Sequence, residues 1–215
     1  MIADRKAFIR AQTRVLPVPH TPEISLHLAD EVTPLWQKTE EELGKIGLPP
    51  PFWAFAWAGG QALARYILDH RDAVAGKRVL DFASGSGLVA IAAMKAGAVS
   101  AHAADIDIFA REAMVLNAAA NGVRIEPVEE NVLGRFDIEA DAILAGDIFY
   151  DREIAAEVLT WLKGWQERGA GVLVGDPGRT YLPKDELRLL ATYQVPVSRE
   201  LEDLEIKKSS VWTLK

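Results

Sequence analysis

The segment 78–87, which reads RVLDFASGSG, constrains the fold of this chain more than any other stretch. An apolar strand carries Asp81 near its end, a loop of small residues with Ser84, Gly85 and Gly87 follows, and an alanine-rich helix begins. Glycines at a strand-to-helix turn let the backbone approach a ligand, whose polar groups meet free N–H groups at the start of the helix. The segment therefore predicts a ligand-binding turn in a doubly wound α/β domain.

A second acidic residue, Asp105, lies 18 positions after Gly87 and follows the next apolar stretch. It is placed to accept hydrogen bonds from a ribose, and Ile106 beside it completes an expected adenosine site. A turn that serves packing alone would leave Asp105 unexplained.

The position of Asp81 discriminates between two adenosine cofactors. In a nicotinamide dinucleotide fingerprint the glycines follow the strand directly, because the loop must accommodate a pyrophosphate. Here Asp81 precedes Gly85 by four residues. A carboxylate repels a pyrophosphate but attracts the ammonium group of a methionine tail.

The spacing Asp-x-x-x-Gly-x-Gly resembles the first motif of class I S-adenosylmethionine-dependent methyltransferases, with Ala83 where a third glycine is usual. The resemblance implies S-adenosylmethionine as cofactor and S-adenosylhomocysteine as product. It also implies a Rossmann-like, seven-stranded, mostly parallel sheet that ends in an antiparallel hairpin.

The hydrophobic pattern agrees with such an α/β fold, because strands and helices alternate after residue 60. We expect residues 51–215 to form the methyltransferase domain and residues 1–50 an N-terminal extension packed on it. The expected strands are 78–82, 98–104, 123–128, 141–146 and 171–175, and the expected helices are 61–69, 88–96, 109–121 and 152–166. Two further strands, 192–200 and 205–213, would form an edge hairpin that tolerates Pro196. In the extension we expect a basic helix at 7–15, a short strand at 24–28 and a helix at 35–43.

Composition narrows the class of function. The formal net charge of −7 disfavours a nucleic-acid substrate and favours a basic protein segment. The chain has no cysteine, and its four histidines lack ligand spacing, so we expect no metal site. No apolar run is long enough to span a bilayer and the start lacks a secretory core, which favours a cytoplasmic protein that does not act at a membrane. We also expect a monomer.

The tetrapeptide Asp147-Ile-Phe-Tyr150 follows the fourth parallel strand, on the edge where open α/β sheets bind ligands. It resembles the Asp/Asn-Pro-Pro-Tyr signature of many N-methyltransferases, although Ile148 and Phe149 replace the prolines. We expect Asp147 to align an amine beside the cofactor, while Phe149 and Tyr150 enclose its alkyl stem. The alternative is that Asp147 caps helix 152–166, but Asp151 competes for that cap.

An aromatic segment precedes the glycine pair Gly59-Gly60. Its first and third aromatic residues, Phe52 and Phe55, are expected to be buried. Trp53 or Trp57 is expected to form a wall at the methionine end of the cofactor, because the glycines let the backbone come close there.

Three weaker signals lie elsewhere. Asn131, after the third strand, is placed to contact the adenine amine. Asp176 and Arg179 either brace the substrate lip or form an ion pair inside a turn. Four acids, Glu200, Glu202, Asp203 and Glu205, either guide a basic substrate or form a solvated turn.

Five blocks in order resemble the lysine methyltransferase family of the electron transfer flavoprotein β-subunit: PFWA at 51–54, WAGGQAL at 57–63, GDIFY at 146–150, GDPGR at 175–179 and SVW at 210–212. Residues 1–20 match no motif of that family. The resemblance implies methylation of lysines on a loop of that flavoprotein subunit. A small nicotinamide-like amine and another protein, such as a ribosomal protein, remain the alternative substrates.

Overall fold

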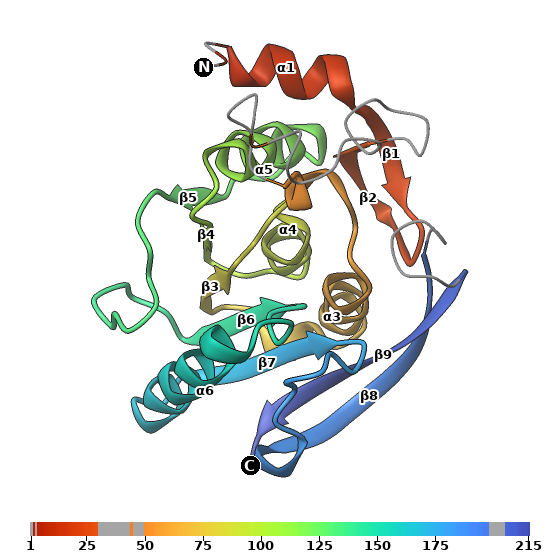
Figure 1. The fold of residues 1–215 in the computed structure, drawn as a ribbon. Helices are drawn as coiled ribbons and strands as arrows, with labels where there is room; N and C mark the ends of the chain where they lie inside the picture. The colour runs from red at the N-terminus through yellow and green to blue at the C-terminus, as the bar shows by residue number, and fades with distance from the viewer. Residues whose placement is uncertain (1, 3, 30–43, 45–49, 198–204) are drawn as a thin grey trace.

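A seven-stranded sheet forms the centre of the molecule, in the order β5-β4-β3-β6-β7-β9-β8 (Figure 1). The computed structural model describes residues 2, 4–29, 44, 50–197 and 205–215. The strands are β3 (Arg78–Phe82), β4 (Ser100–Ala104), β5 (Glu126–Val128), β6 (Ala142–Gly146), β7 (Gly171–Asp176), β8 (Leu187–Pro196) and β9 (Ile206–Leu214). The five strands β3, β4, β5, β6 and β7 run parallel, while β9 is antiparallel to both β7 and β8. The predicted mostly parallel sheet with an antiparallel C-terminal hairpin is confirmed.

Helices cover both faces of this sheet (Figure 1). One core cluster holds α3 (Ala58–Asp69), α4 (Leu88–Lys95) and α5 (Ile108–Ala120), and the other holds α6 (Arg152–Glu167). Adjacent residues of β3 alternate between the faces, so Val79 packs in the first cluster and Leu80 in the second. Strands buried on both faces are largely apolar, which explains the nearly continuous apolar runs in the sequence.

The N-terminal extension contributes to the first of these cores. It comprises α1 (Arg5–Gln12) and an antiparallel pair, β1 (Arg14–Val18) and β2 (Thr21–Leu28). Helix α1 lies beside α5 (Figure 1), and the two pack through Phe8 and Phe109, whose ring centroids are 5.6 Å apart. The extension therefore shares a core with the sheet, and the boundary at residue 50 stays a prediction.

Several element ends differ from the prediction for local reasons. The first helix begins at Arg5 rather than residue 7, because Asp4 caps it by accepting a hydrogen bond from the Ala7 N–H. Helix α3 begins three residues before the expected position 61, which places both glycines of its sequence in its first turn. The expected helix at 35–43 and the acids Glu200, Glu202 and Asp203 lie outside the described residues.

The C-terminal hairpin is longer than predicted. Strand β8 begins at Leu187 and contains an irregularity between Leu189 and Ala191. Pro196 ends β8, which is the outermost strand of the sheet, in agreement with its expected edge position. Within the described residues, three 3₁₀ helices lie in the connections: η1 (Phe52–Ala54), η2 (Arg71–Ala73) and η3 (Lys184–Glu186).

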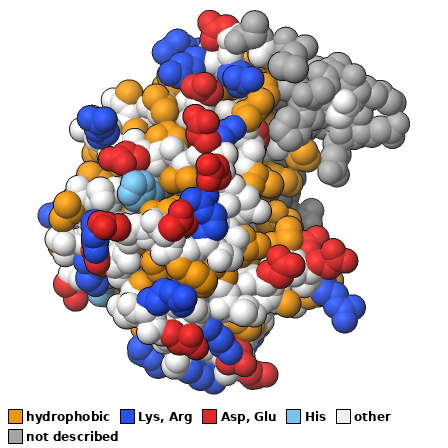
Figure 2. All heavy atoms as spheres, turned by 90° about the vertical axis from the view of Figure 1, so that its left-hand side faces the viewer, with side chains coloured by type: hydrophobic (Ala, Val, Ile, Leu, Met, Phe, Trp, Pro, Cys, Tyr) orange, Lys and Arg blue, Asp and Glu red, His pale blue; other side chains and the backbone are white. Residues whose placement is uncertain are grey.

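The face seen in Figure 2 mixes acidic, basic and apolar side chains. Basic side chains are interspersed with acidic ones there and form no continuous patch. Among the described residues, none of the helices has both the length and the apolar character that crossing a membrane requires.

Candidate active site

The glycine loop after β3 lies at the carboxyl end of the sheet, as predicted. Gly85 has φ +54° and Gly87 has φ +81°, so both occupy the left-handed region that glycine adopts without strain. Ala83 has φ +52° in the same loop, where the related motif has a third glycine. A Cβ atom on Gly87 would come within 3.3 Å of Met114 and Ile125, so Gly87 also permits close packing of the loop on its neighbours.

Asp81 is buried beneath this loop, with 1% of its surface exposed. Its carboxylate accepts hydrogen bonds from the Ser84 hydroxyl and from the Ala90 N–H in α4. Burial raises the pKa of Asp81 to about 7, and the nearby Asp105 carboxylate adds to this rise. A cation beside Asp81 would favour its ionised form.

Asp105 connects the ends of β3 and β4. One carboxylate oxygen accepts a hydrogen bond from the Gly85 N–H at 2.9 Å, and the other accepts one from the Asp107 N–H at 2.9 Å. Burial raises the pKa of Asp105. The next residue, Ile106, is 77% exposed and presents an apolar side chain beside the carboxylate.

These side chains fit the adenosine cofactor that the sequence predicts. Asp81 suits an ammonium group, Asp105 suits ribose hydroxyls, and Ile106 offers an apolar surface for a base. Asn131 lies farther along, after β5, where it is exposed and its side-chain oxygen accepts a hydrogen bond from the Leu133 N–H at 3.0 Å. A contact between Asn131 and the adenine stays a prediction.

Asp147 follows β6 and lies in the second half of the sheet edge that carries the glycine loop. Its backbone has φ +56°, and its side chain is 10% exposed. One carboxylate oxygen accepts a hydrogen bond from the Gly60 N–H at 2.8 Å, and the other accepts one from Arg179 Nη2 at 2.8 Å. Burial raises the pKa of Asp147 to about 6, although Arg179 acts in the opposite direction.

Asp151 caps α6, as expected, by accepting hydrogen bonds from the N–H groups of Glu153 and Ile154. The capping alternative for Asp147 is therefore wrong. The Asp147 carboxylate instead joins the start of α3 to the loop after β7.

The glycine pair in α3 lets the helix approach the sheet. A Cβ atom on Gly59 would lie 2.4 Å from the Gly175 carbonyl oxygen and 2.5 Å from Asp147 Oδ2. A Cβ atom on Gly146 would lie 2.9 Å from the Cα of Gly60. Gly59 is buried against the ends of β6 and β7, so the partner of this close approach is the protein itself rather than an open ligand surface.

Three aromatic side chains from η1, the start of α3 and the loop after β6 cluster together and form what we call the aromatic collar: Phe52, Trp57 and Tyr150. The Phe52 ring centroid lies 5.9 Å from that of Trp57 and 6.4 Å from that of Tyr150. Trp57 Nε1 donates a hydrogen bond to the Phe52 carbonyl at 2.9 Å, which fixes the collar on one side. Phe52 is 53% exposed and Tyr150 is 60% exposed, so the collar faces solvent.

Two residues that were predicted to line the pocket are instead buried in the core. Phe149 is fully buried in the cluster around α6, and Trp53 is 2% exposed with its ring stacked on Phe109. Phe52 was expected to be buried but is exposed, whereas the buried position predicted for Phe55 is confirmed. Residues 52–54 form a 3₁₀ turn, which buries Trp53 and leaves Phe52 exposed.

The loop after β7 is a turn organised by Asp176. Its Oδ1 accepts hydrogen bonds from the N–H groups of Gly178 and Arg179 at 2.6 and 2.7 Å. The Arg179 side chain reaches across to Asp147, and its guanidinium carbon lies 5.8 Å from the centre of the Trp57 ring. Arg179 thus contributes to the site through Asp147, which local spacing did not reveal.

The two halves of the edge interact electrostatically. Asp105 is among the groups that raise the pKa of Tyr150, after burial, so its charge acts across the end of β3. The structure therefore brings Asp81, Asp105 and Asp147 to one edge of the sheet, with the aromatic collar beside them.

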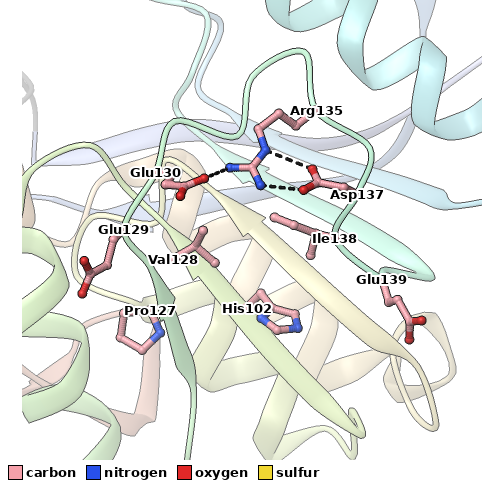
Figure 3. Close-up of a pocket in the computed structure, with 9 residues that line it drawn as sticks. All are labelled: His102, Pro127, Val128, Glu129, Glu130, Arg135, Asp137, Ile138 and Glu139. Atoms are coloured by element: carbon pink, nitrogen blue, oxygen red, sulfur yellow. Dashed lines mark hydrogen bonds and ion pairs between the residues drawn. The ribbon is translucent and has the colours of Figure 1, made fainter.

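A separate hollow of about 660 Å³ opens near β4 and β5 (Figure 3). Arg135 pairs there with Glu130 and Asp137. The hollow is lined by His102, Pro127, Val128, Glu129, Glu130, Arg135, Asp137, Ile138 and Glu139. None of the residues predicted for the active site lines it, so we place the chemistry at the sheet edge.

Comparison with known proteins agrees with this geometry. Residues 61–160 match the family model of ribosomal protein L11 methyltransferase (PrmA). The electron transfer flavoprotein beta subunit lysine methyltransferase of Rattus norvegicus is 37% identical over 96% of this chain and 83% of its own. The enzyme of the same name from Xenopus laevis is 38% identical over 97% of this chain and 86% of its own.

A solved structure shares the fold. The ribosomal protein L11 methylase of Lactobacillus delbrueckii subsp. bulgaricus superposes with a TM-score of 0.52 and 24% identity, over 75% of this chain and 81% of its own. The sheet, the glycine loop and the long, nearly full-length similarity to the flavoprotein methyltransferases agree. The chain is thus a class I S-adenosylmethionine-dependent methyltransferase and belongs to the family of electron transfer flavoprotein beta subunit lysine methyltransferases.

Proposed function

We propose that this enzyme methylates lysine side chains of the electron transfer flavoprotein β-subunit. The observation that carries the proposal is the similarity over 96–97% of the chain to enzymes named for this substrate. The amine site supports it, because Arg179 joins the carboxylate of Asp147 to an exposed aromatic collar. An open collar suits a lysine on a protein surface better than it suits a small ring, which needs an enclosed pocket.

The collar and Asp147 have different tasks in this proposal. The aromatic rings of the collar hold the alkyl stem of the lysine and exclude water, which lowers the pKa of its ammonium group. The ammonium loses its proton to water, and Asp147 aligns the neutral nitrogen. The cofactor, when bound, supplies an electrophilic methyl group on its sulfonium. The new N–C bond forms as the S–C bond breaks, which leaves S-adenosylhomocysteine and a methylated ammonium.

The other half of the edge would hold the cofactor. We assign the ammonium of its methionine part to Asp81, the ribose to Asp105, and the adenine to Ile106 and Asn131. The loop residues Ser84, Gly85 and Gly87 would shape the backbone that approaches the cofactor. Trp57 would close the methionine end, since Trp53 is buried against Phe109.

The acidic character of the chain fits a basic acceptor segment. A net charge of −7 attracts a lysine-bearing loop and repels nucleic acid. We further propose that the enzyme acts as a cytoplasmic monomer away from membranes. Light scattering of the purified protein tests the oligomeric state.

Label transfer from tritiated S-adenosylmethionine to purified β-subunit tests the substrate. We expect label on the β-subunit, mapped by mass spectrometry to lysine, and a strong decrease with the collar variant Phe52→Ala. The Phe55→Ala variant tests whether loss of a neighbouring ring outside the collar decreases label transfer to the same extent. Absence of label on the β-subunit would contradict the proposal.

A ribosomal protein is the second candidate, because the family model that matches residues 61–160 is that of ribosomal protein L11 methyltransferase. The same assay with purified L11 and with nicotinamide as acceptors separates the three alternatives. Label on L11 alone would retain protein methylation with another partner, and label on nicotinamide alone would replace the protein substrate.

A further inference from the structure

Arg179, in the loop after β7, connects this loop to two other parts of the amine site that lie far away in the sequence. Its guanidinium contacts Asp147 at the end of β6 and lies over the ring of Trp57, which precedes α3. We propose that Arg179 is a positioning residue for methyl transfer, which keeps the Asp147 carboxylate ionised and oriented toward the acceptor amine. This inference rests on the proposed function of Asp147 as the group that aligns the amine.

The orientation follows from contacts on both carboxylate oxygens. Arg179 Nη2 donates a hydrogen bond to Asp147 Oδ1 at 2.8 Å, and the Gly60 N–H donates one to Oδ2 at 2.8 Å. Arg179 is itself held by its own N–H, which donates to Asp176 Oδ1 at 2.7 Å. The carboxylate is therefore fixed between α3 and the β7 loop, and its remaining lone pairs point in set directions.

The ionisation follows from the charges around Asp147. Burial favours its neutral form, and the negative charge of Asp176 on the same loop acts in the same direction. Arg179 opposes both, while α3 contributes the N–H of Gly60 from a first turn, AGGQ, that has no charged residue. Without Arg179 the carboxyl group would hold a proton near neutral pH, and a neutral acid attracts an ammonium group far less than a carboxylate does.

The direct test is infrared spectroscopy of the purified apoprotein at about pH 7.5. We expect Arg179→Met to show the carbonyl stretch of a protonated carboxylic acid, because removing a neighbouring opposite charge raises a carboxyl pKa by roughly 1–3 units. The double variant Arg179→Met/Asp147→Asn should lack that band. Arg179→Lys should restore the wild-type spectrum in large part. The matched control is Arg168→Met, whose guanidinium lies over the Phe136 ring.

Binding of S-adenosylhomocysteine is measured for each variant, because retained binding shows that the fold and the cofactor half are intact. Absence of the carboxylic acid band in a folded Arg179→Met variant would overturn the inference. A band that persists in the double variant would also overturn it, since the proton would then reside elsewhere.

Single-turnover methylation of the β-subunit as a function of pH separates this inference from the proposed function. We expect the acid limb of the rate profile to move upward by roughly 1–3 pH units in Arg179→Met and to return in Arg179→Lys. A uniform loss of rate at every pH would contradict the positioning role. An infrared band without any shift of the profile would confirm the effect on Asp147 and reject Asp147 as the aligning group.

Discussion

The cofactor half and the amine half of the sheet edge are built from different kinds of contacts. In the cofactor half, Asp81 binds partners three and nine positions away, and Asp105 binds Gly85 across 20 positions. In the amine half, Asp147 binds Gly60 across 87 positions and Arg179 across 32. One half is a local strand–loop–helix unit, whereas the other exists only when three distant segments pack together.

This difference predicts how each half responds to substitution. A local unit depends on backbone conformation and on the two carboxylates that it carries, so changes there should affect cofactor binding first. The amine half depends on close packing of α3 against β6 and β7, so changes there should affect stability or the transfer step.

The largest expected effect concerns Asp105 in the cofactor half. We expect Asp105→Ala to weaken binding of S-adenosylhomocysteine by roughly 1.5–3 kcal/mol, because hydrogen bonds to a charged group are lost. Isothermal titration calorimetry measures the change. Asp72→Ala, in η2, is the matched control and should bind normally. Equal weakening in both variants would remove Asp105 from the ribose site.

Gly59 tests the packing of the amine half. We expect Gly59→Ala to lower the free energy of unfolding by roughly 1–3 kcal/mol, because its Cβ would overlap the Gly175 carbonyl. Gly60→Ala is the control in the same helical turn, since the nearest atom to its Cβ is Leu88 Cδ2 at 4.0 Å. Denaturant unfolding compares the two, and similar stabilities would show that α3 tolerates a wider spacing.

The buried carboxyl of Asp81 predicts a pH dependence of stability. Its pKa is raised to about 7 when folded, so this group stabilises the apoprotein at low pH, and that contribution is lost as the pH rises through 7. On acidification from pH 8 to pH 5.5, protonation of Asp81 adds roughly 2 kcal/mol to the free energy of unfolding. His20 and His27, whose pKa values are lowered by burial, act in the opposite direction.

The difference between wild type and Asp81→Asn isolates this contribution, because both proteins retain the histidines. Wild type should gain more stability than the variant on acidification from pH 8 to pH 5.5, as measured by urea unfolding. Parallel curves for the two proteins would mean that Asp81 has an ordinary pKa in the folded state.

The smallest effect is expected at Ala83. Its φ of +52° is strained for a residue with a Cβ, so Ala83→Gly should raise the free energy of unfolding by up to about 1 kcal/mol. Ala103→Gly, in the regular part of β4, should instead lower it. Thermal denaturation of the pair shows whether the missing third glycine costs stability.

The cofactor half was predictable because its signals are local. The strand, the acid and the glycines occupy adjacent positions, and apolar runs identified every parallel strand to within a few residues at its ends. The placement of Gly85 beside Asp105 follows from this topology, since adjacent parallel strands end at the same edge.

The amine half was only partly predictable. The sequence identified Asp147 and Tyr150 at the reaction edge, but it gave no sign that Arg179 reaches Asp147 or that Phe52 reaches Tyr150. Such pairs arise from packing between segments, which no spacing rule describes. The 3₁₀ turn of η1 also exposes Phe52, which was expected to be buried, and buries Trp53, which was expected at the cofactor.

The measurement that tests the division into two halves most directly is a pair of assays on Asp147→Ala. We expect calorimetry to find an affinity for S-adenosylhomocysteine within a few-fold of wild type. We also expect the single-turnover rate of methylation of the β-subunit to fall by at least about 100-fold, because the amine is no longer aligned. Wild-type transfer in this variant would contradict the account, and so would a loss of cofactor affinity as large as the loss of rate.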